Sequence, residues 1–320
     1  MSTLKRNRFL FEFLGIAAAL AIVPALIRDQ YFLHITITGL IFGIVASNWN
    51  LAIGYGGIFH LAQVPFFAAG GYASAILAVS MGITPWIGLL AAGGAAVVLS
   101  VIVGVPSLRV RGIYLVFLTF SSQFIMQSLI LFFANITGGD PGLVLPPFSI
   151  ANINIDIFNP VAMYYMTLLL YLFSLAFIKK VTDSDIGLAL KSLRDSEVYA
   201  VSRGVNPYKY KMVTFLLSSF LAGVCGALYV HYLRVITPAV LDWSFLIMFL
   251  ASIVTGGFGT LYGPLLGAFI LTFASEALRA LSLFRNVIFG TLMIVILIFL
   301  PKGLITIADR LLTAYRSRTR

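Results

Sequence analysis

The sequence predicts an all-α, polytopic membrane protein, and three observations support this fold class. Hydrophobic residues make up 60% of the 320 residues and charged residues only 10%, whereas a typical soluble domain has about 25% charged residues. Apolar runs of about 20 residues, the length that crosses a bilayer as a helix, recur along the chain. The basic residues lie in the gaps between these runs. We therefore expect a single transmembrane domain over residues 1–320.

The apolar runs predict about ten spans, with broken or re-entrant segments among them. The first run follows the basic segment Met1–Arg8, but it is long enough to span and no convincing cleavage site follows it, so we interpret it as a retained span. The eighth is short enough to be re-entrant. In chain order the predicted spans are Phe9–Ile27, Phe32–Ala52, Ile58–Val79, Pro85–Val105, Ile113–Ala134, Val161–Ile178, Met212–Tyr232, Phe245–Val254, Pro264–Leu283 and Val287–Leu300.

The distribution of Lys and Arg predicts that both termini are cytosolic. All but four of the 21 basic residues fall on one side of the predicted spans. Because loops rich in Lys and Arg stay in the cytosol, this side is the inner one. The segment 135–160 contains Asp140 and Asp156 but no Lys or Arg, and is then an outer loop. The four exceptions are Arg28, Arg234, Arg279 and Arg285.

The longest polar stretch, Lys179–Lys211, holds seven of the 21 basic residues and predicts a cytosolic loop built from two short helices. Asp183 or Ser184 can cap the first helix. Three apolar residues of that helix share one face, at spacings of four and three. They are Ile186, Leu190 and Leu193.

The second short helix is expected over about 196–203, with Asp195 as its cap. Glu197 lies in its first turn, where a negative charge complements the helix dipole. Gly204 is placed to end the helix in a left-handed conformation, and the Asn206-Pro207 pair stops its continuation. The segment is therefore either a solvated loop that obeys the positive-inside rule or a docking element for a cytosolic partner.

Two segments rich in Gly and Pro interrupt the apolar pattern at membrane depth, one in each half of the chain. Irregular backbone at this depth is tolerated only where it is buried in protein or lines a watery cavity, and paired breaks of this kind indicate a transport pathway. Small residues are equally consistent with close helix packing. The candidate hinge residues are Gly54, Gly56, Gly57 and Pro65 in the first segment, and Gly256, Gly257, Gly259 and Pro264 in the second.

Five amide side chains within the predicted spans are candidates to line a translocation path: Asn48, Asn50, Gln63, Gln123 and Gln127. Since buried amides need hydrogen-bonding partners, we favour the path for the first three. The two others are four residues apart and share a helix face, so they could line a pore or join one helix to another.

The sequence lacks the residues that several other classes of protein require. One Cys and three His exclude a disulfide framework and a Cys/His metal site. The sequence contains no P-loop motif for binding ATP and no nucleophile–base pair that could serve as catalytic residues. We therefore expect a protein that is not an enzyme. Glu276 and Arg279, three residues apart, are expected to pair near the outer interface rather than to relay protons. The net charge of +10 comes from the gaps between spans and does not indicate nucleic-acid binding.

Seven segments, in order along most of the chain, carry motifs of a known family. They are Asn48–Tyr72, Arg109–Thr119, Thr137–Leu143, Gly187–Lys211, Phe215–Tyr229, Ile253–Ala268 and Leu300–Leu304. In these segments the chain resembles the permease subunits of bacterial branched-chain amino acid ABC importers, of the LivM type. The resemblance implies that the polar loop is the EAA-type element through which importer permeases dock their ATPases.

Six positions of this loop match the family pattern, whereas two positions of the loop and one pair of residues in the segment Asn48–Tyr72 depart from it. Tyr199 stands where the pattern has Ala, Ser196 where it has Asn, and Phe59-His60 where it has Ser-Leu. The matching residues, which the resemblance assigns to ATPase coupling, are Arg194, Asp195, Glu197, Ala200, Gly204 and Asn206.

The resemblance also implies the rest of an import machine in the bacterial inner membrane. Its expected partners are a second, LivH-like permease, two cytosolic ATPase subunits that hold ATP and Mg²⁺, and a periplasmic substrate-binding protein. This chain would hold no cofactor itself. Branched-chain amino acids are the expected substrates, with urea or another small amide or acid as the alternative. A secondary transporter would explain the two breaks but would leave the polar loop without a role.

Overall fold

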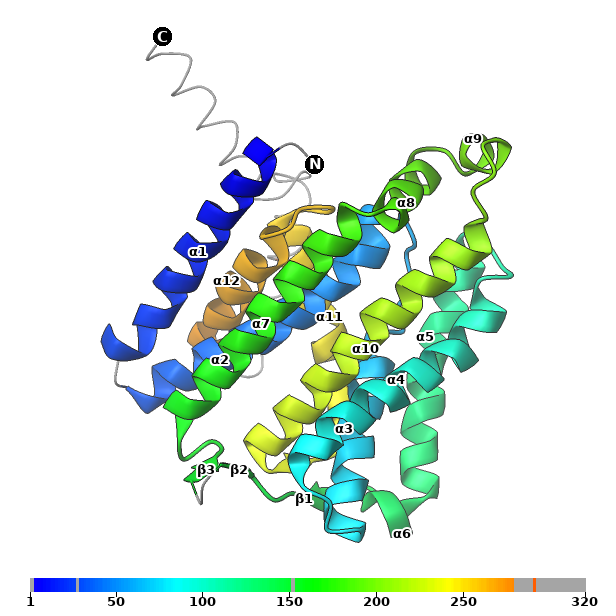
Figure 1. Ribbon diagram of the computed structural model, residues 1–320. Coiled ribbons are helices and arrows are strands. Elements are labelled where there is room, and N and C mark those ends of the chain that lie inside the picture. The colour runs from blue at the N-terminus through cyan, green and yellow to red at the C-terminus, as the bar shows by residue number, and fades with distance from the viewer. Residues whose placement is uncertain (1–2, 27–28, 151–152, 279–289, 292–320) are drawn as a thin grey trace.

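The computed structural model describes residues 3–26, 29–150, 153–278 and 290–291, which form a bundle of helices (Figure 1). In this part of the chain, six helical segments are long and apolar enough to cross a membrane. They are α2 (Gln30–Asn50) with its π-helical continuation η1 (Leu51–Tyr55), α3 (Gln63–Ser80), α4 (Pro85–Ser107), α5 (Ile113–Phe132), α7 (Pro160–Thr182) and α10 (Pro207–Leu233).

Three further helices contain shorter apolar stretches: α1 (Thr3–Leu26), α11 (Trp243–Gly256) and α12 (Gly263–Ala277). The predicted class, an all-α polytopic membrane protein, is confirmed. The count of ten spans stays a prediction, and the tenth, Val287–Leu300, lies outside the described residues except for positions 290–291. So does Arg279, the expected partner of Glu276.

Of the boundaries that differ from the predicted ones, two have clear local reasons. α3 begins at Gln63 rather than Ile58, because residues 56–62 are not helical and Gly57 has a φ of +64°. α10 begins at Pro207, five residues before the predicted Met212. Asn206 does not merely end the preceding structure, since its side chain accepts a hydrogen bond from the backbone N–H of Lys209 (3.2 Å) and so caps α10.

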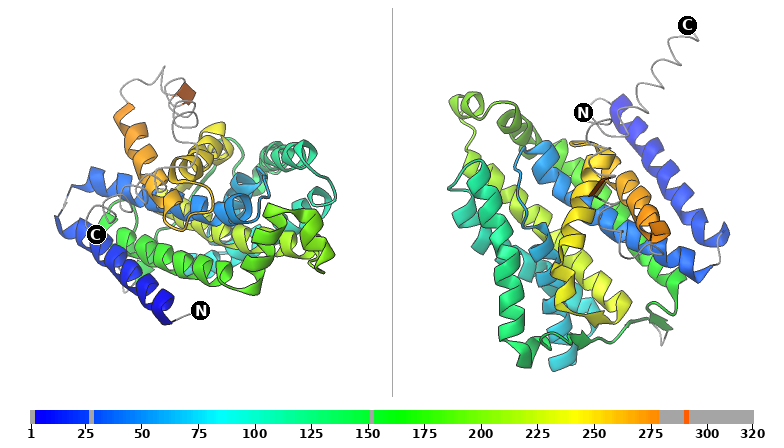
Figure 2. Two further views of the ribbon diagram at one scale, coloured as in Figure 1. Left: turned by 90° about the horizontal axis from the view of Figure 1, so that it is seen from above. Right: turned by 180° about the vertical axis from the view of Figure 1, so that it is seen from behind.

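α2 lies at the centre of the bundle and α5 at its edge. Of the most apolar stretch of α2 and η1, 83% is buried inside the protein, against 28% for α5. α2 contacts α7, α10, α11 and α12, while α10 packs against α3 and α4 (Figure 2). The approach of α10 to α3 requires glycine, because a Cβ on Gly70 would meet the backbone of Gly223.

The two ends of the bundle carry different structures (Figure 1). At one end are the short helices α8 (Asp185–Asp195) and α9 (Glu197–Ser202). At the other, the predicted outer loop contains α6 (Ala134–Thr137) and the strands β1 (Leu143–Val144), β2 (Phe148–Ile150) and β3 (Ile153–Ile155). β2 and β3 form an antiparallel hairpin. β1 pairs with β4 (Val235–Ile236), which follows α10 directly and precedes the 3-10 helix η2 (Pro238–Leu241).

Candidate functional site

The first helix of the polar loop, α8, is anchored by its apolar face. Leu190 and Leu193 are buried, and Ile186 packs against a cluster that includes Leu51 and Tyr55 of η1. Ser184 occupies the N-cap position, although its hydroxyl donates to the carbonyl of Val181 (2.7 Å) instead of capping the helix. The face predicted from the spacing of apolar residues is therefore the face that contacts the spans.

The second helix, α9, is capped by Ser196 and not by Asp195, which corrects the expectation. Ser196 has the extended backbone of a cap residue, with φ −160° and ψ 107°, and its side chain accepts from the N–H of Tyr199 (3.3 Å). Asp195 is the last residue of α8, and its carboxylate accepts from both Nε and Nη2 of Arg194 (each 3.1 Å). Gly204 follows with a φ of +84°, the predicted left-handed end.

Arg194 joins this loop to the first break. Its Nη1 donates to the carbonyl oxygen of Gly54, within η1, at 3.0 Å. The Arg194 side chain also covers Gly57, where a Cβ would lie 2.8 Å from Cγ of the arginine. A guanidinium on a backbone carbonyl forms a charge-assisted hydrogen bond, which is stronger than a neutral one. The polar loop and the first break are thus directly connected.

Asn50 joins the first break to the second. Its Nδ2 donates to the carbonyl of Thr260 (2.8 Å), and its Oδ1 accepts from the N–H of Gly259 (3.0 Å). A Cβ on Gly54 would collide with both Asn50 Oδ1 and Gly259 N, so only glycine fits where these segments meet. We call this set of five residues the Arg194 junction: Arg194, Gly54, Asn50, Gly259 and Thr260.

The second break is a tight turn between α11 and α12. Gly257 has a φ of +108° and Gly259 a φ of +69°, conformations that favour glycine. A Cβ on Gly256 would meet the backbone of Gly263 and lie 2.6 Å from the nitrogen of Pro264. Pro264 occupies the first turn of α12, where a missing N–H costs nothing. The glycines predicted as hinges serve close packing at this position, and their role as hinges stays a prediction.

The first break continues as a non-helical segment, residues 56–62, that leads into α3; Ile58, His60 and Ala62 are buried, while Gly57 and Phe59 are exposed. Its polar groups are satisfied by side chains, because Trp49 Nε1 donates to the carbonyl of His60 (3.0 Å) and the N–H of Leu61 donates to Thr119 Oγ1 (3.0 Å). The His60 ring is fully buried and lies 4.4 Å from the ring of Phe215. Pro65 stands in the first turn of α3. The part of this irregular backbone around His60 is therefore enclosed by protein.

The remaining candidate amides join separate elements and do not converge on one point. Asn48 Nδ2 donates to Ser174 Oγ of α7 (2.8 Å) and Gln123 Nε2 to the carbonyl of Leu241 (2.6 Å). Gln63 Nε2 approaches the carbonyl of Ser218 at 3.5 Å, and Gln127 is half-buried on α5. The side-chain oxygens of Asn48, Gln63 and Gln123 are buried without a partner within the described residues. Their place on a translocation path stays a prediction.

Glu197 is partly exposed and is held by two cations. Its Oε2 accepts from Lys211 Nζ at 2.8 Å, and its Oε1 lies 3.3 Å from Nη2 of Arg111, in the loop between α4 and α5. The hydrogen bond from Lys211 lowers the pKa of the Glu197 carboxyl below its ordinary value, and the charges of Lys211 and Arg111 lower it further. These contacts fix α9 to the beginning of α10.

Apolar side chains that face away from the bundle surround these contacts. Val198 is 83% exposed, although Ala200 of the same helix is buried. Tyr199, the departure from the family pattern, is exposed and accepts a hydrogen bond from Nη2 of Arg203 (2.7 Å). We call the exposed apolar residues of α9 the α9 patch: Val198, Tyr199 and Val201. Leu188 of α8 is exposed as well. A patch of this kind beside charged residues is typical of a protein interaction surface.

A family model described as "Branched-chain amino acid transport system / permease component" matches residues 31–300, which include the Arg194 junction and both loop helices. The chain belongs to this permease family. The matched range contains every loop residue that the resemblance assigned to coupling. No solved structure matches the chain.

The relatives of this permease include two kinds of named protein. The high-affinity branched-chain amino acid transport system permease protein LivM of Escherichia coli K12 is 28% identical, over 95% of this chain and 76% of the relative. The high-affinity branched-chain amino acid transport system permease protein LivH of Salmonella typhimurium is 25% identical, over 87% of this chain and 94% of the relative. A probable LivH permease of Methanocaldococcus jannaschii is 27% identical, over 69% of this chain and 73% of the relative.

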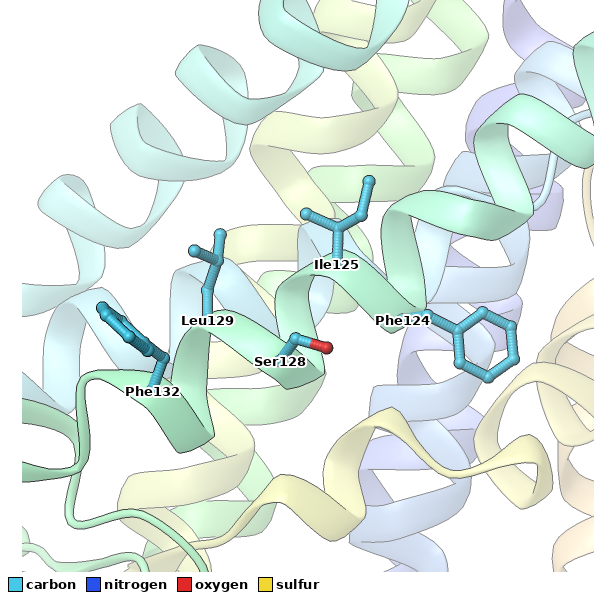
Figure 3. Close-up of a pocket in the computed structure, with 5 residues that line it drawn as sticks. All are labelled: Phe124, Ile125, Ser128, Leu129 and Phe132. Atoms are coloured by element: carbon cyan, nitrogen blue, oxygen red, sulfur yellow. The ribbon is translucent and has the colours of Figure 1, made fainter.

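A shallow concavity of about 430 Å³ on α5 has the chemistry of a surface that faces lipid or another membrane helix (Figure 3). Four of its five lining residues are apolar and none is charged. This concavity of the permease therefore offers a polar substrate no recognition. Its residues are Phe124, Ile125, Ser128, Leu129 and Phe132.

Isolated Ser and Thr residues take part in several of the hydrogen bonds between distant segments. The sequence did not identify these residues as functional candidates. The hydroxyls of Thr119 and Ser174 meet residues that lie 58 and 126 positions away along the chain, and the backbone carbonyl of Thr260 meets Asn50, 210 positions away. An isolated Ser or Thr in an apolar run has no periodicity to distinguish it from a packing residue. The available signal was Asn48, which binds Ser174, and Asn50, which binds Thr260, because a buried amide requires a partner.

Proposed function

We propose that this permease is a membrane subunit of an ATP-driven importer of branched-chain amino acids, and that α8 and α9 dock a cytosolic ATPase. The family match over residues 31–300 and the names of the LivM and LivH relatives support the transport class. The α9 patch supports the docking role, since it offers exposed apolar side chains at the end of the bundle where the basic residues of the loop lie.

The observation that carries the proposal is the Arg194 junction. Arg194 of the docking loop binds Gly54 of η1, and Asn50, the last residue of α2 and directly before η1, binds the turn between α11 and α12. A displacement of α8 is therefore passed to both breaks in the spans. ATP-driven closure of the paired ATPases would use this link to move the helices between inward-open and outward-open arrangements, as packed elements move between discrete states.

The proposed machine contains partners on both sides of the membrane. A second, LivH-like permease completes the transmembrane part, and two ATPase subunits hold ATP and Mg²⁺ below α8 and α9. A periplasmic binding protein delivers the substrate to the end that carries α6 and the strands. The excess of basic residues at the α8 end supports a cytosolic position for that end, and so for both termini in a bacterial inner membrane.

Purification of the chain expressed with its neighbouring genes tests the proposal. Mass spectrometry should identify two copies of a P-loop ATPase and a second permease in the purified complex. Reconstituted with the binding protein, this complex should take up radiolabelled leucine when ATP is supplied and lose uptake with vanadate. A homo-oligomer without ATPase, whose uptake is insensitive to ATP and collapses with ionophores, would establish a secondary transporter instead.

The same reconstituted complex tests the substrate. Excess valine or isoleucine should compete with leucine for uptake, and excess urea should not. Competition by urea alone would leave the ATP-driven mechanism in place and overturn the assignment to branched-chain amino acids.

A further inference from the structure

The edge helix α5 turns polar side chains toward the bundle. Five of its residues are buried, and three of these are polar: Thr119, Ser122 and Gln123. The outer side of the helix carries the apolar concavity described above (Figure 3). Because lipid chains are as apolar as leucine, burial of apolar groups does little to hold helices together in a membrane, and hydrogen bonds between helices contribute to their association. The contacts of the buried polar residues therefore help to fix the position of α5.

Thr119 joins α5 to the first break. Its Oγ1 accepts a hydrogen bond from the backbone N–H of Leu61 at 3.0 Å, and the side chain is fully buried. The same hydroxyl donates within its own helix, to the carbonyl of Leu115 at 2.8 Å. A hydroxyl has one hydrogen to donate and can still accept. Because the helix uses that hydrogen, the hydroxyl is oriented and its oxygen is left to bind Leu61.

The other partner of this hydrogen bond belongs to the segment that Arg194 covers. Residues 56–62 connect η1 to α3, and the Arg194 side chain lies against Gly57 of this segment. Trp49 Nε1 donates to the carbonyl of His60 at 3.0 Å, which attaches the segment to α2 as well. Gly57 and Leu61 are only four residues apart. A displacement of the Arg194 junction therefore reaches Leu61 along a short stretch of backbone.

Gln123 provides a second attachment on the same face of α5, one helical turn beyond Thr119. Its Nε2 donates to the carbonyl of Leu241 at 2.6 Å. Leu241 ends η2, which precedes α11, and the opposite end of α11 begins the second break. The side-chain oxygen of Gln123 is buried without a partner within the described residues, whereas the Thr119 hydroxyl both donates and accepts. Of the two attachments, the one through Thr119 is the more completely satisfied.

Among the six spanning segments that the structure describes, α5 is the least enclosed. The buried share of its most apolar stretch is 28%, against 39–83% for the others. An element with few buried contacts shifts at a lower free-energy cost than an element of the core. The position of α5 is therefore sensitive to its individual hydrogen bonds.

We infer that Thr119 is a positioning residue, through which the first break moves α5 when the docking loop moves. It acts through the backbone of Leu61. The movement of α5 during transport rests on the proposed function, whereas the attachment of α5 to the first break rests on the structure alone.

Hydrogen–deuterium exchange of the full chain in lipid nanodiscs tests the attachment without transport. Thr119→Val keeps the shape of the side chain but removes the acceptor of the Leu61 N–H. We expect this amide to exchange about 2–10-fold faster in the variant, the factor that corresponds to one hydrogen bond. Thr119→Ser keeps the hydroxyl and should exchange at the wild-type rate. Unchanged exchange of Leu61 in Thr119→Val would overturn the inference.

Thr167→Val is the matched control. Thr167 of α7 is also fully buried, and its hydroxyl donates to the carbonyl of Met163 in its own helix (2.8 Å), with no hydrogen bond to another element within the described residues. The control removes the same chemical group without detaching one helix from another. It should leave the exchange of Leu61 unchanged.

The ratio of leucine transported to ATP hydrolysed by the reconstituted complex tests the positioning role. In Thr119→Val we expect this ratio to fall about fivefold or more, the lower end of coupling between distant sites, while the rate of ATP hydrolysis changes less than about twofold. Thr119→Ser and Thr167→Val should keep the wild-type ratio. If Thr119→Val does not elute as a monodisperse peak, Thr119→Ala replaces it, because alanine is well tolerated within a helix.

An unchanged ratio in Thr119→Val would overturn the inference, and so would an equal fall in Thr119→Val and Thr167→Val. A wild-type complex without ATP-driven uptake would contradict the proposed function instead. The exchange of Leu61 would still decide whether Thr119 attaches α5 to the first break.

Discussion

The two helices of the polar loop differ in how they are held, although a single residue, Ser196, separates them. α8 buries Leu190 completely and reaches the spans through Arg194. α9 turns Val198 outward, 83% exposed, and is fixed mainly by the ion pairs of Glu197. The comparison indicates a division of labour, in which α8 is the part that moves with the spans and α9 is the part that a partner touches.

The energetics of the two attachments differ in the same direction. Complete burial of a Leu side chain contributes about 1.5–3 kcal/mol, and the bond of Arg194 to a backbone carbonyl is charge-assisted. Lys191 adds a contact with the ring of Tyr55, its Nζ lying 5.8 Å from the ring centroid. Ion pairs that stay partly exposed contribute only up to about 1 kcal/mol. Substitutions around α8 should therefore affect the fold and the coupling, and substitutions on α9 should affect association.

The largest effect is expected at the point where α8 meets both breaks. In Gly54→Ala the new Cβ collides with Asn50 Oδ1 and Gly259 N, which displaces the hydrogen bonds of Asn50. We expect a loss of about 2–3 kcal/mol in stability, the cost of overpacking, and a clear fall in the temperature at which the detergent-solubilised protein loses its monodisperse elution peak. Gly94→Ala in α4 is the control, because nothing lies within 4 Å of its added Cβ. Equal thermal stability of the two variants would contradict the junction.

The next effect separates coupling from assembly. Arg194→Ala removes the bond to Gly54, and a hydrogen bond that involves a charged group is worth about 1.5–3 kcal/mol. We expect ATP-driven leucine uptake by the reconstituted complex to fall about tenfold or more while ATP hydrolysis continues. Arg203→Ala, which removes only the exposed bond to Tyr199 within α9, should change uptake less than about twofold.

Asp195→Asn refines this result, since it removes the ionic partner of Arg194 but leaves the bond to Gly54. Its uptake should stay close to that of the wild type. Equal impairment of uptake by Arg194→Ala and Arg203→Ala would mean that both helices couple the loop to the spans. The proposed division between coupling by α8 and partner contact by α9 would then be wrong.

Local sequence signals predicted much of this loop. The spacing of Ile186, Leu190 and Leu193 identified the face of α8 that contacts the spans, because a helical period of 3.6 fixes which side chains share a face. Gly204 was predicted to adopt a left-handed backbone conformation, since glycine alone adopts that conformation without strain. The breaks themselves were visible because Gly and Pro stood out from apolar runs. Each of these signals operates within a few residues.

Contacts between distant segments were not predictable. Arg194 and Gly54 are 140 positions apart, and Asn50 and Gly259 are 209 apart. No local pattern indicates that two breaks and one loop share a single point, since this follows from how α2, α11 and α12 pack. The prediction of Asp195 as the cap of α9 was wrong for a local reason. Asp195 and Ser196 are both good capping residues, and the backbone becomes extended at Ser196.

A smaller effect should appear when the apolar surface of α9 is made acidic. Val198→Asp places a charge where an apolar contact is proposed, so we expect the ATPase to be lost from the purified complex during washing. The thermal stability of the permease should not change, because the side chain contacts little of its own chain. Val144→Asp is the matched control, an equally drastic change at a valine that is 78% exposed at the opposite end of the bundle. Retention of the ATPase by both variants would place the docking surface elsewhere.

The smallest effect concerns the ion pairs that hold α9. Glu197→Gln should lower stability by less than about 1 kcal/mol, since the carboxylate is partly exposed and salt screens it. The pKa of Glu197 is lowered in the folded protein, so its contribution is fully present above the ordinary pKa of a glutamate and disappears as the pH falls through the lowered value. The loss measured by thermal unfolding should therefore be the same at about pH 6 and about pH 8, and smaller in high salt. A loss that grows between these two pH values would assign the attachment of α9 to a group other than Glu197.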